Sequence, residues 1–410
     1  MPALRFRLAR SASSAAPAFG QWRARWHERR LYLAAHPFAY CLAAVARRVA
    51  SVCTIPRIGH VVSDAALAKH VLSTPELFAK TGPGALSDAL TQVMGSKALV
   101  NMDGEPHRLL RARLRDIFAP RFAAELVARI FAPALAEARA ALEAGAAIDV
   151  VRLARILAGR SACALAGIEL TSDERCLEMH RHGRDFARAL SLATRRLTGA
   201  QLAHARERFD ALTLSAHAAF AAGGETTVPG RLRAAGLTFD EARGLIAILL
   251  LAGTETTASA LPRLVALLVD TGQWAALRAD PPRVAAAVDE GLRLTAPVAL
   301  VTRNVVSATV LGDRRLRPGE RVVVCLASAL KAQEAAADAG FDYGRVQAPG
   351  VANLWFGQGP HACPGAALAR REITTALEAL LACGDVRVVR RRYARDAVFA
   401  GYARLEVRRD

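Results

Sequence analysis

Lysine is the scarcest charged residue in this chain of 410 residues, because only four of its 55 basic side chains are lysine and the rest are arginine. The basic residues outnumber 37 acidic ones, which gives a net charge of +18 and would suit an acidic partner. The arginines are spread along the predicted helices, and the aromatic-and-basic pattern of known nucleic-acid modules does not occur. We therefore expect no nucleic-acid partner.

Apolar runs of membrane-spanning length are also missing from the sequence. A spanning helix needs about 18 consecutive apolar residues, but the run from Leu31 to Ala46 is interrupted by His36 and Pro37, and the run from Leu245 to Ala252 is too short. Hydrophobic residues still make up 53% of the chain, which is enough for a large core. We expect a globular protein without stable membrane insertion.

Cysteines are not paired by spacing, which excludes a disulfide framework. The seven cysteines are widely separated, odd in number and contain no Cys-x-x-Cys pair. This pattern is typical of a reduced compartment, so we expect the protein to be cytoplasmic.

Acidic residues are absent from residues 1–27, which contain several serines and five arginines, Arg5, Arg7, Arg10, Arg23 and Arg25. A transit peptide has such a composition and stays as the minor alternative. Because arginine is abundant everywhere, we favour an arginine-rich N-terminal tail over residues 1–30. No change in composition divides the remainder, so residues 31–410 are predicted to form a single domain.

The most informative stretch is Phe356–Gly365, which holds one cysteine in a glycine-rich loop. Apolar residues at helical spacing then predict a helix that ends near Cys383-Gly384. Cys363 precedes this helix, where the macrodipole and free backbone N–H groups stabilise a thiolate, and Pro364 suits the first turn. Gly357 and Gly359 permit close approach of a planar ligand. We interpret Cys363 as a ligand of heme iron.

Two other interpretations of this loop exist. A lone cysteine is often a buried structural residue. The pattern Gly357-x-Gly359-x-x-Ala362 also satisfies a loose dinucleotide fingerprint, which requires a βαβ unit and an acidic residue about 20 positions later. Pro360 and the cysteine in the turn fit that fingerprint poorly, and little chain remains after it.

A second motif lies in the middle of a predicted long helix. Thr238 and Glu241 form a capping-box pattern at its start, and the apolar run that follows leads into residues 252–257, Ala-Gly-Thr-Glu-Thr-Thr. A carboxylate and hydroxyls are expensive to bury without a purpose, and a glycine costs about 1 kcal/mol of helix propensity. Threonines that bond back to helix carbonyls are the alternative. Pro262 is expected to bend this helix.

Other segments give weaker signals. His107 and Arg111 lie four apart on a predicted helix, where two donors can grip a carboxylate or phosphate. Glu290 and Arg293 have the i,i+3 spacing of an ion pair. We predict a long loop with a short helix over residues 81–102, mostly helix from 112 to about 225, a helix over 65–72, and strands within 53–62, 298–306, 310–312, 321–326, 386–389 and 405–407.

Taken in this order and spacing, the four motifs resemble the cytochrome P-450 superfamily of heme-thiolate monooxygenases. They are His107-x-x-x-Arg111, the segment 252–257, Glu290-x-x-Arg293 and the Phe356–Gly365 loop. The resemblance covers roughly residues 55–410 and is to the soluble bacterial type. It implies a mainly α fold with smaller β-sheets (α+β), in which heme lies between a long central helix and the helix after the cysteine loop.

The resemblance also implies a role for each matching residue. Cys363 is the axial ligand of heme b, iron protoporphyrin IX, and Glu255 and Thr256 are the acid and alcohol that deliver protons to dioxygen. Glu290 and Arg293 support the loop beneath the heme. The cofactor is held by His107, Arg111, Ala252, Arg303, Phe356, Gly357, His361 and Gly365. Substrate-pocket residues inferred from position are Leu249, Gly253, Val298, Val301 and Phe399.

The implied function is insertion of one oxygen atom from O2 into an apolar small molecule, by hydroxylation or epoxidation. Electrons come from NAD(P)H through a ferredoxin or flavodoxin-type partner. Oxidative coupling, desaturation or rearrangement is the alternative chemistry, and a non-catalytic heme protein that binds a ligand is the alternative of another class. Residues 341–345, Phe-Asp-Tyr-Gly-Arg, match the family pattern only loosely, which leaves the pairing of Arg345 with Glu290 open.

Overall fold

The computed structural model describes residues 18–82, 87–169, 172–189, 197–331 and 340–410. Its helices are α1 (Ala18–Ala35), α2 (Pro37–Val49), α3 (Ala65–Ser73), α4 (Ser87–Met94), α5 (Gly104–Arg113), α6 (Pro120–Glu143), α7 (Val150–Ala166), α8 (Asp173–Ala189), α9 (Gly199–Thr213), α10 (His217–Ala222), α11 (Val228–Ala234), α12 (Phe239–Asp270), α13 (Trp274–Arg278), α14 (Val284–Thr295), α15 (Leu326–Ala329) and α16 (Ala366–Leu381). The mainly helical fold expected from the sequence is confirmed.

The strands are short and gather in small sheets. They are β1 (Val52–Ile55), β2 (Gly59–Val62), β3 (Phe78–Ala79), β4 (Ile148–Asp149), β5 (Leu300–Val305), β6 (Thr309–Leu311), β7 (Arg314–Leu316), β8 (Arg321–Cys325), β9 (Val386–Tyr393) and β10 (Tyr402–Arg409). β3, β4 and β7 contain only two or three residues each, too few for the alternating pattern from which a strand is predicted.

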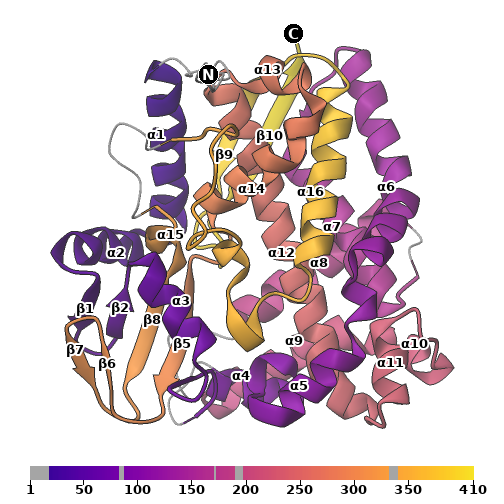
Figure 1. Ribbon diagram of the computed structural model, residues 1–410. Helices are drawn as coiled ribbons and strands as arrows, with labels where there is room; N and C mark the ends of the chain where they lie inside the picture. The colour runs from indigo at the N-terminus through magenta and orange to yellow at the C-terminus, as the bar shows by residue number, and fades with distance from the viewer. Residues whose placement is uncertain (1–17, 83–86, 170–171, 190–196, 332–339) are drawn as a thin grey trace, which may run out of the picture.

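The largest sheet has the order β1-β2-β8-β5-β3, in which only the β2–β8 pair is parallel. This arrangement joins the N-terminal hairpin to strands that follow α14, more than 200 residues later. A second sheet has the order β4-β10-β9. Figure 1 shows β5, β8 and the small β6–β7 hairpin at the lower left, while the long helices occupy the rest of the molecule.

The central element is α12, which packs against α7, α8, α14 and α16 (Figure 1). It opens with the expected capping box, in which Thr238 and Glu241 hydrogen-bond reciprocally, and it continues through Pro262 to Asp270. By length and a mean hydropathy of 1.6 it could cross a membrane, but 61% of that apolar window is buried inside the protein. A core helix of a folded domain has the same properties.

The expected boundary of the N-terminal tail at residue 31 needs correction. Helix α1 begins at Ala18, and its residues Ala24 and Leu31 are fully buried in a hydrophobic cluster that extends to Val407. The Arg263 guanidinium of α12, itself buried, donates to the Glu28 carboxylate of α1. Residues 18–30 therefore belong to the folded body, because apolar side chains in an arginine-rich helix still find a core. Residues 1–17 lie outside the described part.

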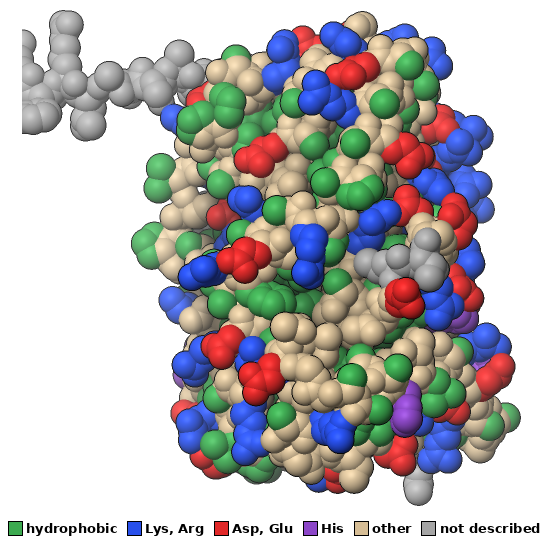
Figure 2. Space-filling view, turned by 90° about the vertical axis from the view of Figure 1, so that its right-hand side faces the viewer, with side chains coloured by type: hydrophobic (Ala, Val, Ile, Leu, Met, Phe, Trp, Pro, Cys, Tyr) green, Lys and Arg blue, Asp and Glu red, His purple; other side chains and the backbone are tan. Residues whose placement is uncertain are grey.

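Charged side chains of both signs are interspersed on the face shown in Figure 2, with apolar side chains between them. Many of the arginines pair with acidic neighbours on the surface, as Arg121 does with Glu125 and Arg139 with Glu143. The arginines of this face are thus interspersed with acidic side chains.

Candidate active site

The Cys363 loop is fixed by its backbone. The N–H of Cys363 donates to the Phe356 carbonyl at 2.8 Å, and Gly357 and Gly359 adopt φ angles of +76° and +71° that favour glycine. A Cβ on Gly359 would lie 2.4 Å from the Leu72 carbonyl oxygen of α3, so only glycine fits there. The loop feeds directly into α16, for which Gly365 is the N-cap. The expected position of Cys363 before a helix is confirmed.

The Cys363 thiol is accessible, yet protein atoms surround it closely enough to affect its ionisation. Burial raises the pKa of Cys363, and the Gly365 backbone N–H and the Arg111 and Arg370 guanidinium groups oppose that rise. These groups stabilise the thiolate, which is the form that ligates a metal. The Arg370 guanidinium also lies 4.7 Å from the centre of the Phe356 ring and thereby holds the two ends of the loop together.

A cluster of basic side chains adjoins the loop. His107 and Arg111 come from α5, Arg303 from β5 and His361 from the loop, as predicted, and the His107 and His361 rings are 4.2 Å apart. The structure adds Lys80, whose pKa is lowered to about 8, first by burial and then by Arg303. Burial also lowers the pKa of Arg111 and Arg303.

Asp103 is the carboxylate of this cluster. It accepts hydrogen bonds from the Thr81 N–H at 2.8 Å and the Thr81 hydroxyl at 2.7 Å, and the His361 Nε2 lies 2.6 Å from its other oxygen. Burial opposes its ionisation, but hydrogen bonds from His361 and Thr81 outweigh burial and lower the pKa of Asp103. Asp103 therefore stays ionised, and it is one carboxylate in a cluster that contains Lys80, Arg111, Arg303 and two histidines.

A cavity of about 1010 Å³ lies between α5 and the cysteine loop, and Asp103, His107, Arg111, His361 and Pro364 are among the residues that line it. Neither Cys363 nor a residue of α12 is among its lining residues, so the cavity adjoins the basic cluster and not the open face of α12. The excess of basic over acidic groups calls for further anionic charge, and the two propionates of a heme would supply it through charge-assisted hydrogen bonds. The donor set of thiolate and basic groups therefore fits heme.

The middle of α12 presents an open face. Ala252 is exposed although most of the helix around it is buried, and a Cβ built on Gly253 would meet no atom within 4 Å. Thr256 lies one turn further on, and its hydroxyl donates to the Ala252 carbonyl at 2.7 Å. The back-bonding that was the alternative interpretation of the threonines is thus present, because Thr254 and Thr257 also donate to carbonyls four residues earlier.

The Glu255 carboxyl lies against α8. Its Oε1 is 3.2 Å from the Nε2 of His180, a buried residue of that helix. Burial raises the pKa of Glu255 to about 7, and the guanidinium groups of Arg155, Arg184 and Arg188 limit the rise. Glu255 and Thr256 are therefore adjacent in sequence but make their contacts with different elements.

Glu290 and Arg293 form the expected ion pair, and both side chains are buried. Arg293 donates to both carboxylate oxygens of Glu290, at 2.7 and 2.8 Å. Arg345, whose pairing the sequence left open, donates to Glu290 at 3.3 Å, and Gln347 donates at 2.7 Å. A single buried carboxylate thus ties α14 to the segment that leads to the cysteine loop.

The residues expected to line a substrate pocket are Leu249, Gly253, Val298, Val301 and Phe399, and each is half-buried. They come from α12, from the start of β5 and from the turn before β10. Ser259 of α12 donates to the Ala400 carbonyl at 2.8 Å, which holds that turn against α12. The loop over residues 81–102 contains α4, but residues 83–86 of it lie outside the described part.

The dinucleotide interpretation of the glycine loop fails on topology. The strand that follows α16 is β9, which pairs only antiparallel, with β10, in the described chain. The fingerprint requires a parallel βαβ unit around its loop. Gly357 and Gly359 therefore serve the cysteine loop and not a phosphate site.

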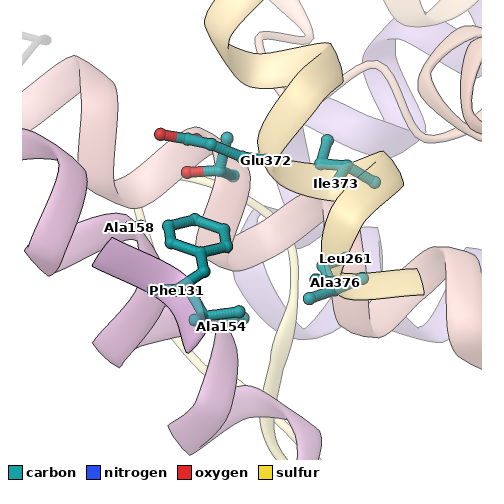
Figure 3. Close-up of a pocket in the computed structure, with 9 residues that line it drawn as sticks. Phe131, Ala154, Ala158, Leu261, Glu372, Ile373 and Ala376 are labelled. Carbon is teal, nitrogen blue, oxygen red and sulfur yellow. The ribbon is translucent and has the colours of Figure 1, made fainter. Parts of the chain in front are cut away.

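Glu372 is a buried carboxyl that the sequence did not reveal. It lies on α16, and Figure 3 shows it beside a small apolar pocket lined by Phe131 of α6 and Leu261 of α12. Burial raises the pKa of Glu372 to about 8, although the hydroxyls of Ser161 and Thr257 lower it. The Ser161 hydroxyl does not reach full hydrogen-bond geometry with any described group, so we regard it as a weak partner.

His180, Lys80 and Glu372 were missed because each belongs to a segment whose pattern predicts only an amphipathic helix or a loop. Polar residues at such positions face solvent by default. Asp103 was missed as well. A signal was available for it, since Asp103 stands four residues before His107 and adjoins the same helix.

Comparison with known proteins supports the geometry. The sequence profile of the family described as cytochrome P-450 matches residues 275–390, which include the Glu290–Arg293 pair and the Cys363 loop. Cytochrome P-450 monooxygenase PikC of Streptomyces venezuelae is 41% identical over 154 residues, which span 37% of this chain and 36% of PikC. Cytochrome P-450 109 of Bacillus spizizenii is 27% identical over 332 residues, 76% of this chain and 75% of that protein.

The fold comparison extends over nearly the whole chain. The crystal structure of P-450 BioI, solved in complex with a fatty-acid-ligated acyl carrier protein, has a TM-score of 0.78 and 20% identity, and the match covers 94% of this chain and all of that one. At this identity the likeness shows the fold. Together with the profile match around Cys363 and the curated bacterial relatives, it shows that the chain belongs to the cytochrome P-450 family.

Proposed function

We propose that this protein is a heme-dependent monooxygenase that inserts one oxygen atom from O2 into an apolar small molecule. The carrying observation is the accessible Cys363 thiol directly before α16, where the Gly365 N–H and the Arg111 guanidinium favour the thiolate against burial, which raises the pKa. A heme held by a cysteine thiolate activates dioxygen, because the thiolate donates electron density to the iron.

The chain's own residues would bind and orient the cofactor. Cys363 would ligate the iron, and Arg111, Arg303, His107 and His361 would donate hydrogen bonds to the propionates. Lys80 joins this set, since it lies among the same basic groups. Phe356, Gly357 and Gly365 form the loop on one side, and Ala252 forms part of the wall on the other.

Glu255 and Thr256 would supply protons at the open face of α12. The pKa of Glu255, raised to about 7 by burial, is suitable for an acid that exchanges a proton near neutral pH. The Thr256 hydroxyl already donates to the Ala252 carbonyl, which leaves its oxygen lone pairs free to accept a proton-carrying hydrogen bond.

The substrate would lie against apolar side chains. Leu249, Val298, Val301 and Phe399 offer no ionisable group, and Gly253 leaves space on α12. An uncharged or weakly polar molecule fits such a wall, because an unpaired charge there would lose its hydration without compensation.

The electron donor would be a ferredoxin or flavodoxin-type protein that obtains electrons from NAD(P)H. Arg108 and Arg115 are exposed at the cavity mouth on the α5 side, and Arg113 is exposed beside them. Such a basic surface would attract an acidic protein, so the rate of electron transfer should fall as the salt concentration rises. Location in the cytoplasm stays a prediction.

The decisive experiment is the carbon monoxide difference spectrum of the reduced holoprotein. We expect the red-shifted band of a thiolate-ligated heme in the wild type and in Cys383→Ser, a control cysteine at the end of α16. Cys363→Ser should lose the band. Absence of the band from the wild type would overturn the proposal.

A second measurement separates turnover from simple ligand binding. With NADPH, a ferredoxin and its reductase supplied, a monooxygenase consumes dioxygen faster when a ligand that shifts the heme spin state is added. Reduced heme with a normal spectrum but no ligand-dependent consumption would instead support a non-catalytic heme protein. Product analysis would then distinguish oxygen insertion from coupling, desaturation or rearrangement.

A further inference from the structure

Three buried polar atoms without a hydrogen-bond partner in the described chain lie on two facing helices. They are the His180 Nδ1 and the Arg184 Nε on α8, and the Glu255 Oε1 on α12. The two helices are in close contact here, since the position of a Cβ on Gly183 would be within 4 Å of the Thr254 hydroxyl. Buried polar groups without partners are rare and indicate a bound water or a functional role.

The charges around Glu255 come from two helices packed against α12. Arg155 of α7 and Arg184 and Arg188 of α8 lower the pKa of Glu255, while Asp185 raises it. Burial, and then Arg155, Arg184 and Arg181, lower the pKa of His180 to about 3. His180 is therefore neutral at neutral pH and carries one ring proton.

The short contact decides which ring nitrogen holds that proton. The His180 Nε2 lies 3.2 Å from the Glu255 Oε1, and above the pKa of about 7 the ionised carboxylate can only accept. The tautomer with a proton on Nε2 is thus favoured, and Nδ1 becomes an acceptor for water or for the neighbouring Arg184. The angle is not yet that of a full hydrogen bond, so a small shift of the carboxyl would complete it.

We infer that His180 is a positioning residue that holds the Glu255 carboxyl at the α8–α12 contact through its Nε2–H and sets the pH range over which Glu255 donates protons. This inference rests on the proposed function. It assigns α8 a part in oxygen chemistry that the sequence motifs place on α12 alone. Among the histidines of the described chain, only His180 has a ring nitrogen within 4 Å of the Glu255 carboxyl.

The test compares three variants of the holoprotein. His180→Ala removes the donor, and His180→Gln keeps an N–H at nearly the same place. His182→Ala is the matched control, since His182 is on the same helix but pairs with Glu178 at 3.6 Å. Each variant must show the thiolate band with carbon monoxide and the wild-type melting temperature before it is used.

The first readout is hydrogen peroxide released per dioxygen consumed, with NADPH, a ferredoxin and its reductase and a ligand that shifts the heme spin state and is converted to product. We expect His180→Ala to divert about five- to tenfold more dioxygen to peroxide, because one hydrogen bond to a charged group is lost. The pH midpoint of this ratio should rise by about one unit. His180→Gln should lie within about twofold of wild type, and His182→Ala should match it.

The second readout is the ¹⁵N chemical shift of His180 in the diamagnetic ferrous carbon monoxide complex. A protonated Nε2 is expected at pH 8, where Glu255 is ionised, and a protonated Nδ1 at that pH would overturn the inference even if His180→Ala does not fold. An unchanged peroxide ratio and pH midpoint in His180→Ala, or failure of His180→Gln to rescue, would also overturn it. Loss of the thiolate band from the wild type would instead reject the proposed function.

Discussion

Two buried carboxyls beside the middle of α12 have opposite surroundings. Glu255 lies on α12 and faces basic side chains of α7 and α8, with His180 at 3.2 Å. Glu372 lies on α16 beside an apolar pocket of only about 10 Å³, at the limit for one water, and its polar neighbours are hydroxyls (Figure 3). Burial is the largest cause of the raised pKa in both cases.

The neighbours decide what each carboxyl can do. Arginines hold the pKa of Glu255 at about 7, where a small change in pH moves the proton. Two hydroxyls leave the pKa of Glu372 at about 8, so it stays largely protonated at neutral pH. We therefore interpret Glu255 as the exchanging acid and Glu372 as a structural group that is stable only while neutral.

The largest expected effect is on the pH dependence of the free energy of unfolding, through the buried Glu372 carboxyl. The unfolded carboxyl titrates near 4.5 and the folded one near 8, so the folded protein binds more protons between these values. Stability must therefore fall as the pH rises through this window. Glu372→Gln should remove roughly 3–5 kcal/mol of that loss between pH 4.5 and 9.

The measurement is the free energy of unfolding in urea at pH 5, 7 and 9. Glu378→Gln is the control, since Glu378 is exposed on the same helix. If Glu372→Gln and wild type lose stability in parallel, Glu372 is not a buried neutral acid and the contrast with Glu255 disappears.

The next effect concerns activity. Glu255→Gln should lower ligand-dependent turnover about a hundredfold, which is in the range for loss of a general acid, because the amide cannot release a proton. Glu372→Gln should stay within about threefold of wild type. The measurement is product formed per electron supplied by a surrogate ferredoxin system. Equal losses in the two variants would break the proposed division of roles.

A smaller effect is expected for Glu255, whose raised pKa also makes stability depend on pH. Glu255→Gln should remove this dependence. The folded pKa of Glu255 is also raised, from 4.5 to about 7, so stability again falls as the pH rises between these values. The folded pKa of about 7 already contains the effect of the nearby arginines, and the shift corresponds to a loss of about 3 kcal/mol, less than at Glu372. Urea unfolding at pH 5 and 8 would measure it. A loss larger than that at Glu372 would contradict the comparison.

The smallest effect is predicted for Thr257→Val. Its hydroxyl lowers the pKa of Glu372, so removal should raise that pKa further, by less than about one unit. The midpoint of the pH-dependent stability loss reports this shift. Thr254→Val is the matched control, because its hydroxyl is bonded to the Leu250 carbonyl at 2.6 Å and does not affect Glu372. An unchanged midpoint would mean that Thr257 does not contact the carboxyl effectively.

Secondary structure was predicted well where it depends on hydrogen bonds between residues that are close in sequence. The capping box at Thr238 and the helix after Gly365 appear in the structure as expected, because their hydrogen bonds join residues three or four apart. The short strands β3, β4 and β7 could not be predicted, since two or three residues acquire strand geometry only from the partner strand.

The residues of the candidate site also fall into those that local sequence predicts and those that it does not. Cys363, His107, Arg111, Glu255 and Glu290 could be singled out because each stands in a motif of fixed spacing. The partners that tune them, such as His180 and Lys80, come from distant segments whose polar residues look like solvent-exposed ones. The predicted boundary of the N-terminal tail was wrong for a related reason. Helix α1 is rich in arginine, so its few buried apolar residues, such as Ala24 and Leu31, do not form a recognisable pattern in the sequence.

The order of residues along the chain is enough to predict the cysteine loop, the long helix with Glu255 and Thr256, and the Glu290–Arg293 pair, because short-range spacing dictates which side chains share a turn or a helical face. Which carboxyl is surrounded by arginines and which by apolar groups depends on how the helices pack. The pKa of a buried acid depends on burial and on charges within a few ångströms, and those neighbours are assembled from α6, α7, α8 and α16 only when the chain has folded.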